Sequence, residues 1–337
     1  MQQESQKISN ETNEKPQSPE SEQTDSETIP EAEQISHAAD KKDYVLSASI
    51  FISAIILAGA WVYTTSLKYP QNSTQVQSQT ESQTTTNELE EKLLPSEGIV
   101  LPVRWGNLGA KMISAGMIDE EKFEELYASR GGLDGETRKL LYGESNGNLK
   151  ITSENSGIIL NLLWALGLGT KNDVLETGPM NDPQYGGAGN FASTGGWTLT
   201  KGDVMTHYSQ HPFVVLNREQ QELVERAAKN IYRPCCNNST HFPDCNHGMA
   251  MLGLLELMAS QGISEKEMYK VALQVNSFWF PDTYIAIAQY LESKGTDWTE
   301  ANPKELLGYD FSSAAGYRQI LSQVNPPERK SSGGCGV

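Results

Sequence analysis

The densest group of reactive side chains in this chain reads C-C-x4-H-x3-C-x-H-G and ends at Gly248. Five side chains that bind soft or borderline metals lie within thirteen residues: Cys235, Cys236, His241, Cys245 and His247. They include three of the four cysteines and two of the five histidines of the chain. Thiolate and imidazole ligands suit zinc, copper(I) or iron, and a tetrahedral site needs only four of the five. The segment therefore predicts a transition-metal site with zinc, copper or iron as its cofactor.

The same cysteines permit two other interpretations. A disulfide from Cys235 or Cys236 to Cys245 would staple the loop in an oxidising compartment. Alternatively, the same cysteines could shuttle electrons, as in thiol-disulfide redox proteins. The spacing matches neither the C-x2-C pairs of zinc fingers nor C-x-x-C-H haem attachment, so the metal, redox and stapling hypotheses all stay open.

Three further residues are weaker candidates for the same site. His207 and His211 are spaced i, i+4, which places two imidazoles on one helical face. No glutamate base lies between them, so two partly exposed histidines at a helix end are the simpler interpretation. Cys335 lies in the Gly-rich C-terminal tail, where its thiol could exchange with a disulfide, supply a last metal ligand, pair with another chain or have no role.

Known enzyme signatures do not account for this sequence, so no catalytic residue is assigned and an enzymatic role stays open. The G-x-G-x-x-G and G-x-x-x-x-G-K-[ST] patterns are missing. A hydrolase set can be assembled from Cys245, His207 and Asp244, but almost any cysteine-containing domain would yield one. The formal net charge of −17 argues against a nucleic-acid partner, which requires a basic surface.

The elements that must position these residues are predicted to be helices. Apolar spacing, capping residues and Gly or Pro stops predict helices near residues 105–115, 119–127, 158–168, 217–232, 247–260, 265–280, 281–293 and 314–323. Asp134 can cap a further short helix. Residues 170–203 are too rich in Gly for one long helix and predict a long loop. Because period-2 patterns are scarce, the fold class is mainly α, with a Cys/His-containing domain at 96–326.

A membrane anchor is predicted ahead of this domain. Nineteen residues without a charge run from Val45 to Tyr63, within a transmembrane helix expected at 44–67. Polar low-complexity sequence surrounds it, which predicts a disordered tail at 1–43 and a flexible stalk at 68–95, while residues 327–337 form a flexible Gly/Cys tail. Lys41 and Lys42 outweigh Lys68, so we expect a single-pass protein of the cell membrane with a cytoplasmic N-terminus and an extracytoplasmic C-terminal domain.

The cysteine segment, the stretch WGNLGAKMISAGMIDEEKFEELY and the GGCGV end resemble single-span prokaryotic membrane proteins that carry no assigned activity. The likeness covers the expected outer domain and, more loosely, the anchor. It implies the architecture of a membrane-tethered domain and brings no catalytic residues. The leading hypothesis is therefore an extracytoplasmic, membrane-anchored metal-binding domain whose lipid partner is the bilayer. The rivals are a redox protein that uses the same cysteines with Cys335, and a disulfide-stapled structural or interaction domain.

Overall fold

The computed structural model describes residues 88–324, which belong to one compact unit. The expected N-terminal tail at 1–43, the transmembrane helix at 44–67, most of the stalk and the C-terminal tail with Cys335 lie outside the described residues. Within 88–324, no helix combines the length and the apolar character that crossing a bilayer requires.

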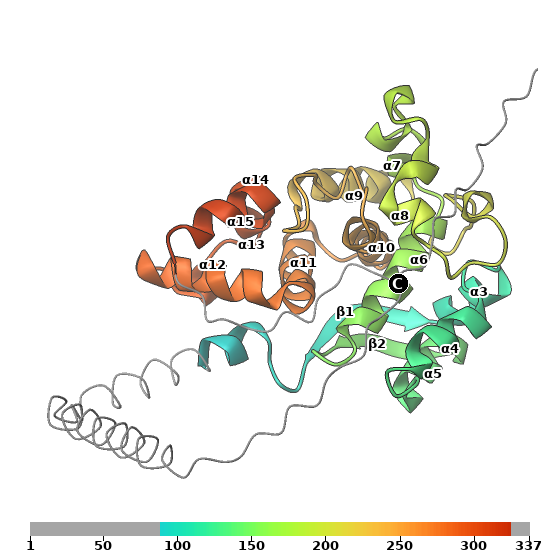
Figure 1. Cartoon of the computed structure of the whole chain (residues 1–337), viewed down its shortest axis with the longest axis horizontal. Helices are drawn as coiled ribbons and strands as arrows, with labels where there is room; N and C mark the ends of the chain where they lie inside the picture. Colours follow the sequence, from blue (N-terminus) through green and yellow to red (C-terminus); the bar gives the residue numbers. More distant parts are fainter. Residues whose placement is uncertain (1–87, 325–337) are drawn as a thin grey trace, which may run out of the picture. The chain divides into compact units, whose positions relative to one another are not determined.

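The described chain is mainly helical, which confirms the predicted fold class (Figure 1). Its longer helices, each of seven residues or more, are α3 (Leu108–Ser114), α4 (Glu120–Ala128), α5 (Gly135–Tyr142), α6 (Ser156–Gly169), α9 (Arg218–Asn230), α10 (Asn246–Ser260), α11 (Glu265–Trp279), α12 (Pro281–Ser293) and α15 (Ala314–Leu321). The shorter ones are α7 (Asp173–Glu176), α8 (Ala192–Gly195), α13 (Pro303–Leu306) and α14 (Tyr309–Ser312).

Several helices begin where the sequence predicts. Asn217 accepts from the backbone N–H of Gln220, whose side chain accepts from the Asn217 N–H, so α9 opens with a full capping box. Ser264 caps α11, and Pro281 occupies the first turn of α12, where its missing N–H costs no hydrogen bond. These starts are predictable because each depends on residues adjacent in the chain.

A two-stranded antiparallel sheet was not expected, and the predicted helix at 105–115 is wrong at its start. Trp105 lies in β1 (Ile99–Gly106), which pairs with β2 (Asn146–Ile151), and the helix begins only at Leu108. Along β1 the buried side chains are Leu101, Val103 and Trp105, so the strand does alternate with period 2. The indole of Trp105 donates to the carbonyl of Leu140 at 2.7 Å, which joins the sheet to α5.

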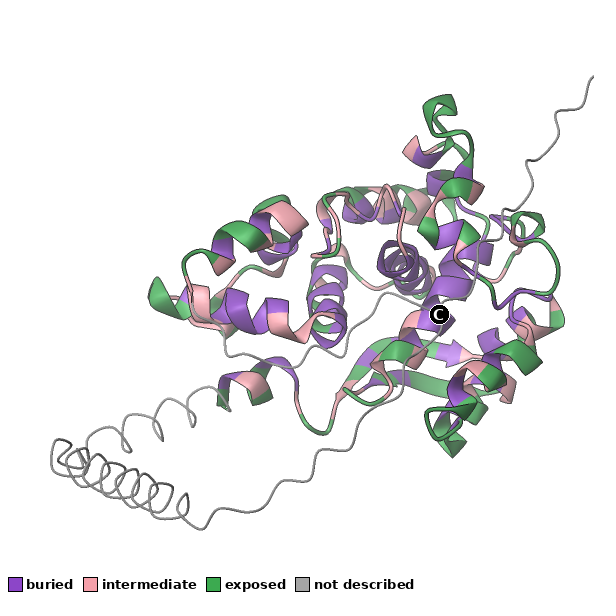
Figure 2. Cartoon of the chain, in the orientation of Figure 1, coloured by how far each residue is buried: buried purple, intermediate pink, exposed green. Residues whose placement is uncertain are grey.

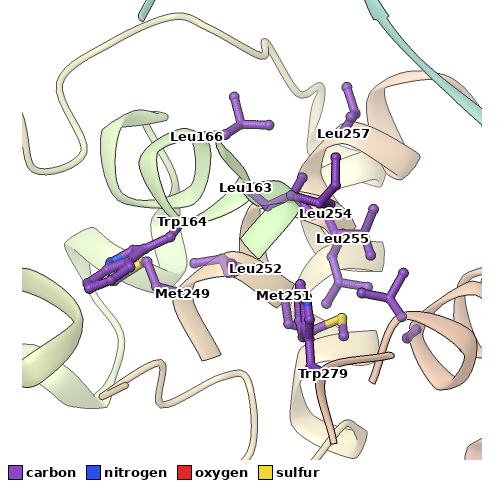
Figure 3. Close-up of a cluster of buried hydrophobic side chains, with 14 of the residues drawn as sticks. Leu163, Trp164, Leu166, Met249, Met251, Leu252, Leu254, Leu255, Leu257 and Trp279 are labelled. Atoms are coloured by element: carbon purple, nitrogen blue, oxygen red, sulfur yellow. The ribbon is translucent and has the colours of Figure 1, made fainter. Parts of the chain in front are cut away.

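The core centres on the crossing of α6 and α10, both buried along most of their length (Figure 2). Gly167 and Gly253 let the two backbones meet: a Cβ on Gly167 would lie 2.2 Å from the carbonyl oxygen of Met249, and a Cβ on Gly253 would lie 2.4 Å from that of Leu163. Around this crossing, leucines and methionines of both helices gather with Trp164 and with Trp279 of α11 (Figure 3). The N-terminal end of α10 is thereby fixed in place.

The Gly-rich segment 170–203 contains short helices and 3-10 turns instead of one long loop. It packs on the cysteine segment: the N–H of Ser193 donates to the carbonyl of Asp244 at 3.1 Å. Phe191 and Tyr185 both stack edge-on against Phe242, with ring centroids 5.3 and 5.4 Å apart. The predicted loop thus supports the segment that carries the candidate ligands.

Candidate metal centre

The cysteine segment joins α9 to α10 and is held by backbone hydrogen bonds from several directions. The N–H of Tyr232 donates to the carbonyl of Leu307, and the N–H of Thr240 donates back to Ile231, both at 2.8 Å. At the first turn of α15, the N–H of Ala314 donates to the carbonyl of Cys236 at 2.9 Å. These contacts close the loop onto its own start and onto the C-terminal helices.

Three of the sequence-predicted ligands converge. The ligand atoms of Cys235, Cys245 and His247 all lie within 4.8 Å of one another. The two sulfurs are 3.4 Å apart. Cys235 is exposed, Cys245 is half-buried and His247 is buried, with its ring 4.4 Å from the ring of Phe280. We call these three residues the Cys235 triad.

Cys236 belongs to a second group, with Asp244 and Cys245, whose ligand atoms also lie within 4.8 Å of one another. Its sulfur lies 3.8 Å from the carbonyl of Asn238 and 3.9 Å from a carboxylate oxygen of Asp244. The neighbouring Cys235 thiol lowers the pKa of Cys236, but the contact with Cys245 and burial outweigh it and raise that pKa to about 11. Cys236 therefore stays protonated at neutral pH beside a carboxylate that is already engaged.

Arg233 is a fully buried cation beneath both groups. Its guanidinium donates to the sulfur of Cys245 at 2.9 Å, to the carbonyl of Asn238 at 2.9 Å and to the carbonyl of Phe242 at 3.0 Å. It also forms a salt bridge with Asp244, whose other carboxylate oxygen accepts from the side chain of Asn238. One side chain thus ties together both ends of the ligand-bearing loop.

The arrangement favours a thiolate at Cys245. This residue is the N-cap of α10, and the N–H of Gly248 points at its sulfur at 3.4 Å. Contacts with Cys235 and Cys236 lower the pKa of Cys245 well below its usual value, and the charge of Arg233 lowers it further. The shared hydrogen bonds and burial raise the pKa of Cys235 in turn. One of the two closest sulfurs is thus anionic and the other is the proton donor.

The structure explains why the motif ends in a glycine, Gly248. A Cβ at this position would lie 2.5 Å from the guanidinium carbon of Arg233. The guanidinium is buried and fixed by four hydrogen bonds, so it has no space to retreat. Glycine is therefore the residue that lets the first turn of α10 pass over the cation.

The other histidine candidates face other partners. The Nε2 of His241 lies 3.6 Å from a carboxylate oxygen of Glu225 on α9. His207 and His211 contact each other through Nδ1 and Nε2 at 2.9 Å, and the Nε2 of His207 lies 3.1 Å from the carbonyl of Lys201. Because a carbonyl only accepts, the Nε2 of a neutral His207 carries the proton, and its Nδ1 then accepts from the Nε2–H of His211. The Nδ1 of His207 and the Nε2 of His211 are thus hydrogen-bonded to each other.

The groups that organise the site were not recognised from the sequence. Arg233 was not identified, Gly248 was named only as the end of the motif and the expected helix start, and Asp244 was considered only as part of a generic hydrolase set. Their signal in the sequence is the run R-P-C-C before the loop and D-C-x-H-G after it. An arginine beside cysteines is usually exposed, and nothing in the local sequence tells that this one is buried.

Comparison with protein-family models, curated proteins and solved structures gave no match for this chain. The site must therefore be interpreted from its own geometry. The Cys235 triad and the group of Cys236, Asp244 and Cys245 lie close enough together to hold a metal ion. The donors are sulfur and imidazole with one carboxylate, which is the chemistry of zinc and copper(I) sites.

Proposed function

We propose that this chain is a membrane-anchored protein whose extracytoplasmic domain binds zinc through Cys235, Cys245 and His247. The observation that carries the proposal is the convergence of two sulfurs and one imidazole within 4.8 Å at the buried start of α10. Two thiolates and one imidazole form a donor set that zinc prefers. The loop needs no rearrangement to bring these atoms together.

Charge balance favours zinc over copper(I). The positive charge of Arg233 is offset by Asp244, its salt-bridge partner. The two negative charges of the thiolates at Cys235 and Cys245 then balance the two positive charges of zinc. With copper(I), which carries one positive charge, the site would keep a net negative charge. A buried site is most stable when its charges cancel. Zinc binding releases the proton of Cys235, since a thiol binds the metal as the thiolate.

The exposed ligand favours an exchangeable site over a closed structural one. Structural zinc sites have four protein ligands, whereas three protein ligands leave a coordination position for water or an incoming molecule. Cys235 is exposed, and Cys236 is directed at Asn238 and Asp244. The site is therefore suited to accept and deliver metal, or to bind a fourth ligand from solution.

The membrane location is supported by the sequence alone. The uncharged run from Val45 to Tyr63 supplies the anchor, and Lys41 and Lys42 favour a cytoplasmic N-terminus. Polar sequence at 68–95 would hold the domain away from the bilayer. On this arrangement the cysteine segment faces the extracytoplasmic side.

Zinc stoichiometry of the purified full chain, reduced and free of oxygen, tests the proposal. We expect one equivalent of zinc, and Cys245→Ser or His247→Gln should weaken binding by more than the roughly 10–100-fold that follows the loss of an outer-shell partner. His241→Gln is the matched control, because His241 faces Glu225 and should leave the affinity unchanged. Stoichiometric zinc retained in Cys245→Ser, with unchanged affinity, would contradict the proposal.

A further inference from the structure

The two sulfurs of the Cys235 triad lie at a distance that suits a second chemistry. We propose that Cys235 and Cys245 also close to a disulfide by exchange with a small-molecule disulfide, and that this closure expels the metal. The second half of the proposal rests on the proposed function, since it requires that the same sulfurs hold zinc. The first half stands on the geometry of the two thiols alone.

The sulfurs are 3.4 Å apart, so they must approach by about 1.4 Å to reach the bonded distance of a disulfide. Cys245 is the fixed partner, held by the guanidinium of Arg233 and the N–H of Gly248. Cys235 is the adjustable partner, because it is exposed and lies in the turn that follows the buried Arg233. Closure therefore needs a small shift of one exposed turn.

Cys236 also lies within 4.8 Å of Cys245, but its sulfur is engaged by other partners. Its sulfur contacts the carbonyl of Asn238 and a carboxylate oxygen of Asp244. Its backbone carbonyl is held by the first turn of α15 through Ala314. Adjacent cysteines also bond to each other only with strain, so Cys235 is the partner that the geometry selects for Cys245.

The exchange proceeds in two steps. The exposed Cys235 passes its proton to the Cys245 thiolate and attacks one sulfur of the external disulfide, which forms a mixed disulfide on Cys235. The first small thiolate leaves and takes the proton from Cys245. The Cys245 thiolate then attacks the Cys235 sulfur, which forms the internal disulfide and releases the second small thiolate. The protein dithiol loses two electrons, and the external disulfide gains them as two thiols.

Oxidation and metal binding are mutually exclusive in this scheme. A sulfur within a disulfide is no longer a thiolate, so closure removes two of the three protein ligands at once. His247 alone provides one donor, which does not hold zinc at the buried start of α10. An oxidising pulse would therefore release the ion, and a reductant would restore the site.

The test uses the full chain, purified in detergent and loaded with zinc, with glutathione disulfide as the oxidant. Zinc binding is measured before the oxidant is added, so that a failure of the proposed function is seen separately. We expect one equivalent of zinc released and two equivalents of glutathione formed for each Cys235–Cys245 disulfide mapped by mass spectrometry. A thiol reductant should return zinc binding to its starting value.

Three variants assign the steps. Cys245→Ser should trap glutathione on Cys235, because the resolving sulfur is gone. Cys235→Ser should show no internal disulfide, and Cys236→Ser should behave as the wild type. The same oxidation is run on zinc-free protein: a Cys235–Cys245 bond formed there supports the exchange whatever the zinc result. The exchange is overturned if both thiols stay alkylatable or if the disulfide involves Cys236 or Cys335. The metal-release half is overturned if zinc stays bound after closure.

Discussion

At the scale of single residues, two buried ionisable groups lie at α10, one beneath its first turn and one on the helix itself. Arg233 lies under the first turn of α10 and is compensated by Asp244 and the Cys245 sulfur. Glu256 is fully buried two and a half turns further along α10 and accepts from Asn172 at 2.7 Å. The first charge has a partner of opposite sign. The second has only neutral partners, so it takes up a proton instead.

Replacing Glu256 with Gln should stabilise the protein at neutral and alkaline pH. Burial raises the pKa of Glu256 well above its usual value, although the hydrogen bond from Asn172 and the nearby hydroxyl of Thr170 oppose the shift. The folded state therefore keeps a proton that the unfolded state releases above about pH 4.5. Stability from this group is present below that pH and is lost as the pH rises. Gln supplies the same oxygen to Asn172 and a donor to Thr170 without a charge.

Denaturant unfolding between pH 4.5 and 8.5 measures this effect. The free energy of unfolding of Glu256→Gln should exceed that of the wild type at pH 8 by more than the ~0.5 kcal/mol typical of surface substitutions. The difference should shrink toward pH 4.5. Glu97→Gln, at an exposed position, is the control that should follow the wild type. Parallel pH profiles for Glu256→Gln and the wild type would show that Glu256 is not protonated in the fold.

At the scale of elements, α10 connects the site to the core. Its first turn carries Cys245 as N-cap and His247, and its middle crosses α6 at Gly253. A Cβ on Gly253 would lie 2.4 Å from the carbonyl oxygen of Leu163 and 2.7 Å from the backbone nitrogen of Gly167. Backbone atoms cannot turn aside as a side chain does, so any larger residue must push the helices apart.

Gly253→Ala should therefore destabilise the domain by about 1–3 kcal/mol, the usual cost of overpacking a core. Gly157→Ala is the matched control, because it lies in α6 with no atom within 4 Å of an added Cβ. That control should be neutral or stabilising by up to about 1 kcal/mol, since Ala is the better helix former. Equal thermal midpoints for the two variants would mean that the helices do not cross at these glycines.

Local features of the elements were predictable and distant pairings were not. The starts of α9, α11 and α12 follow from caps and a proline that act within one turn. The strand β1 was not predicted, and its last two residues were assigned to a helix, because its partner, β2, lies some forty residues away and stabilises it only after folding. The candidate site divides in the same way. The thirteen-residue cysteine segment was visible, whereas the burial of Arg233 depends on tertiary packing.

At the scale of the whole molecule, the membrane topology determines which redox environment the cysteines meet. All four cysteines follow the expected anchor at 44–67 in the sequence. On the proposed topology they face the extracytoplasmic side, where disulfides form and persist. The proposed change from a zinc-bound dithiol to a disulfide can occur only if the oxidant reaches Cys235.

A membrane-impermeant maleimide applied to intact cells tests this topology. After brief reduction and chelation, Cys235 should be labelled without permeabilisation, because it is exposed and expected outside. A cysteine introduced by Ser21→Cys, in a variant whose four native cysteines are serine, should be labelled only after the cells are permeabilised. If Cys235 is labelled only after permeabilisation, the domain faces the cytoplasm and the proposed topology is wrong.

On the proposed function, two sulfurs and one imidazole of this chain bind one zinc ion. Zinc-edge X-ray absorption of the reduced full chain with one equivalent of zinc measures the ligands directly. We predict two sulfurs at about 2.3 Å and at least one nitrogen at about 2.0–2.1 Å, with one sulfur lost in Cys235→Ser. A shell of nitrogen and oxygen alone, or a sulfur count that Cys235→Ser leaves unchanged, would contradict the assignment.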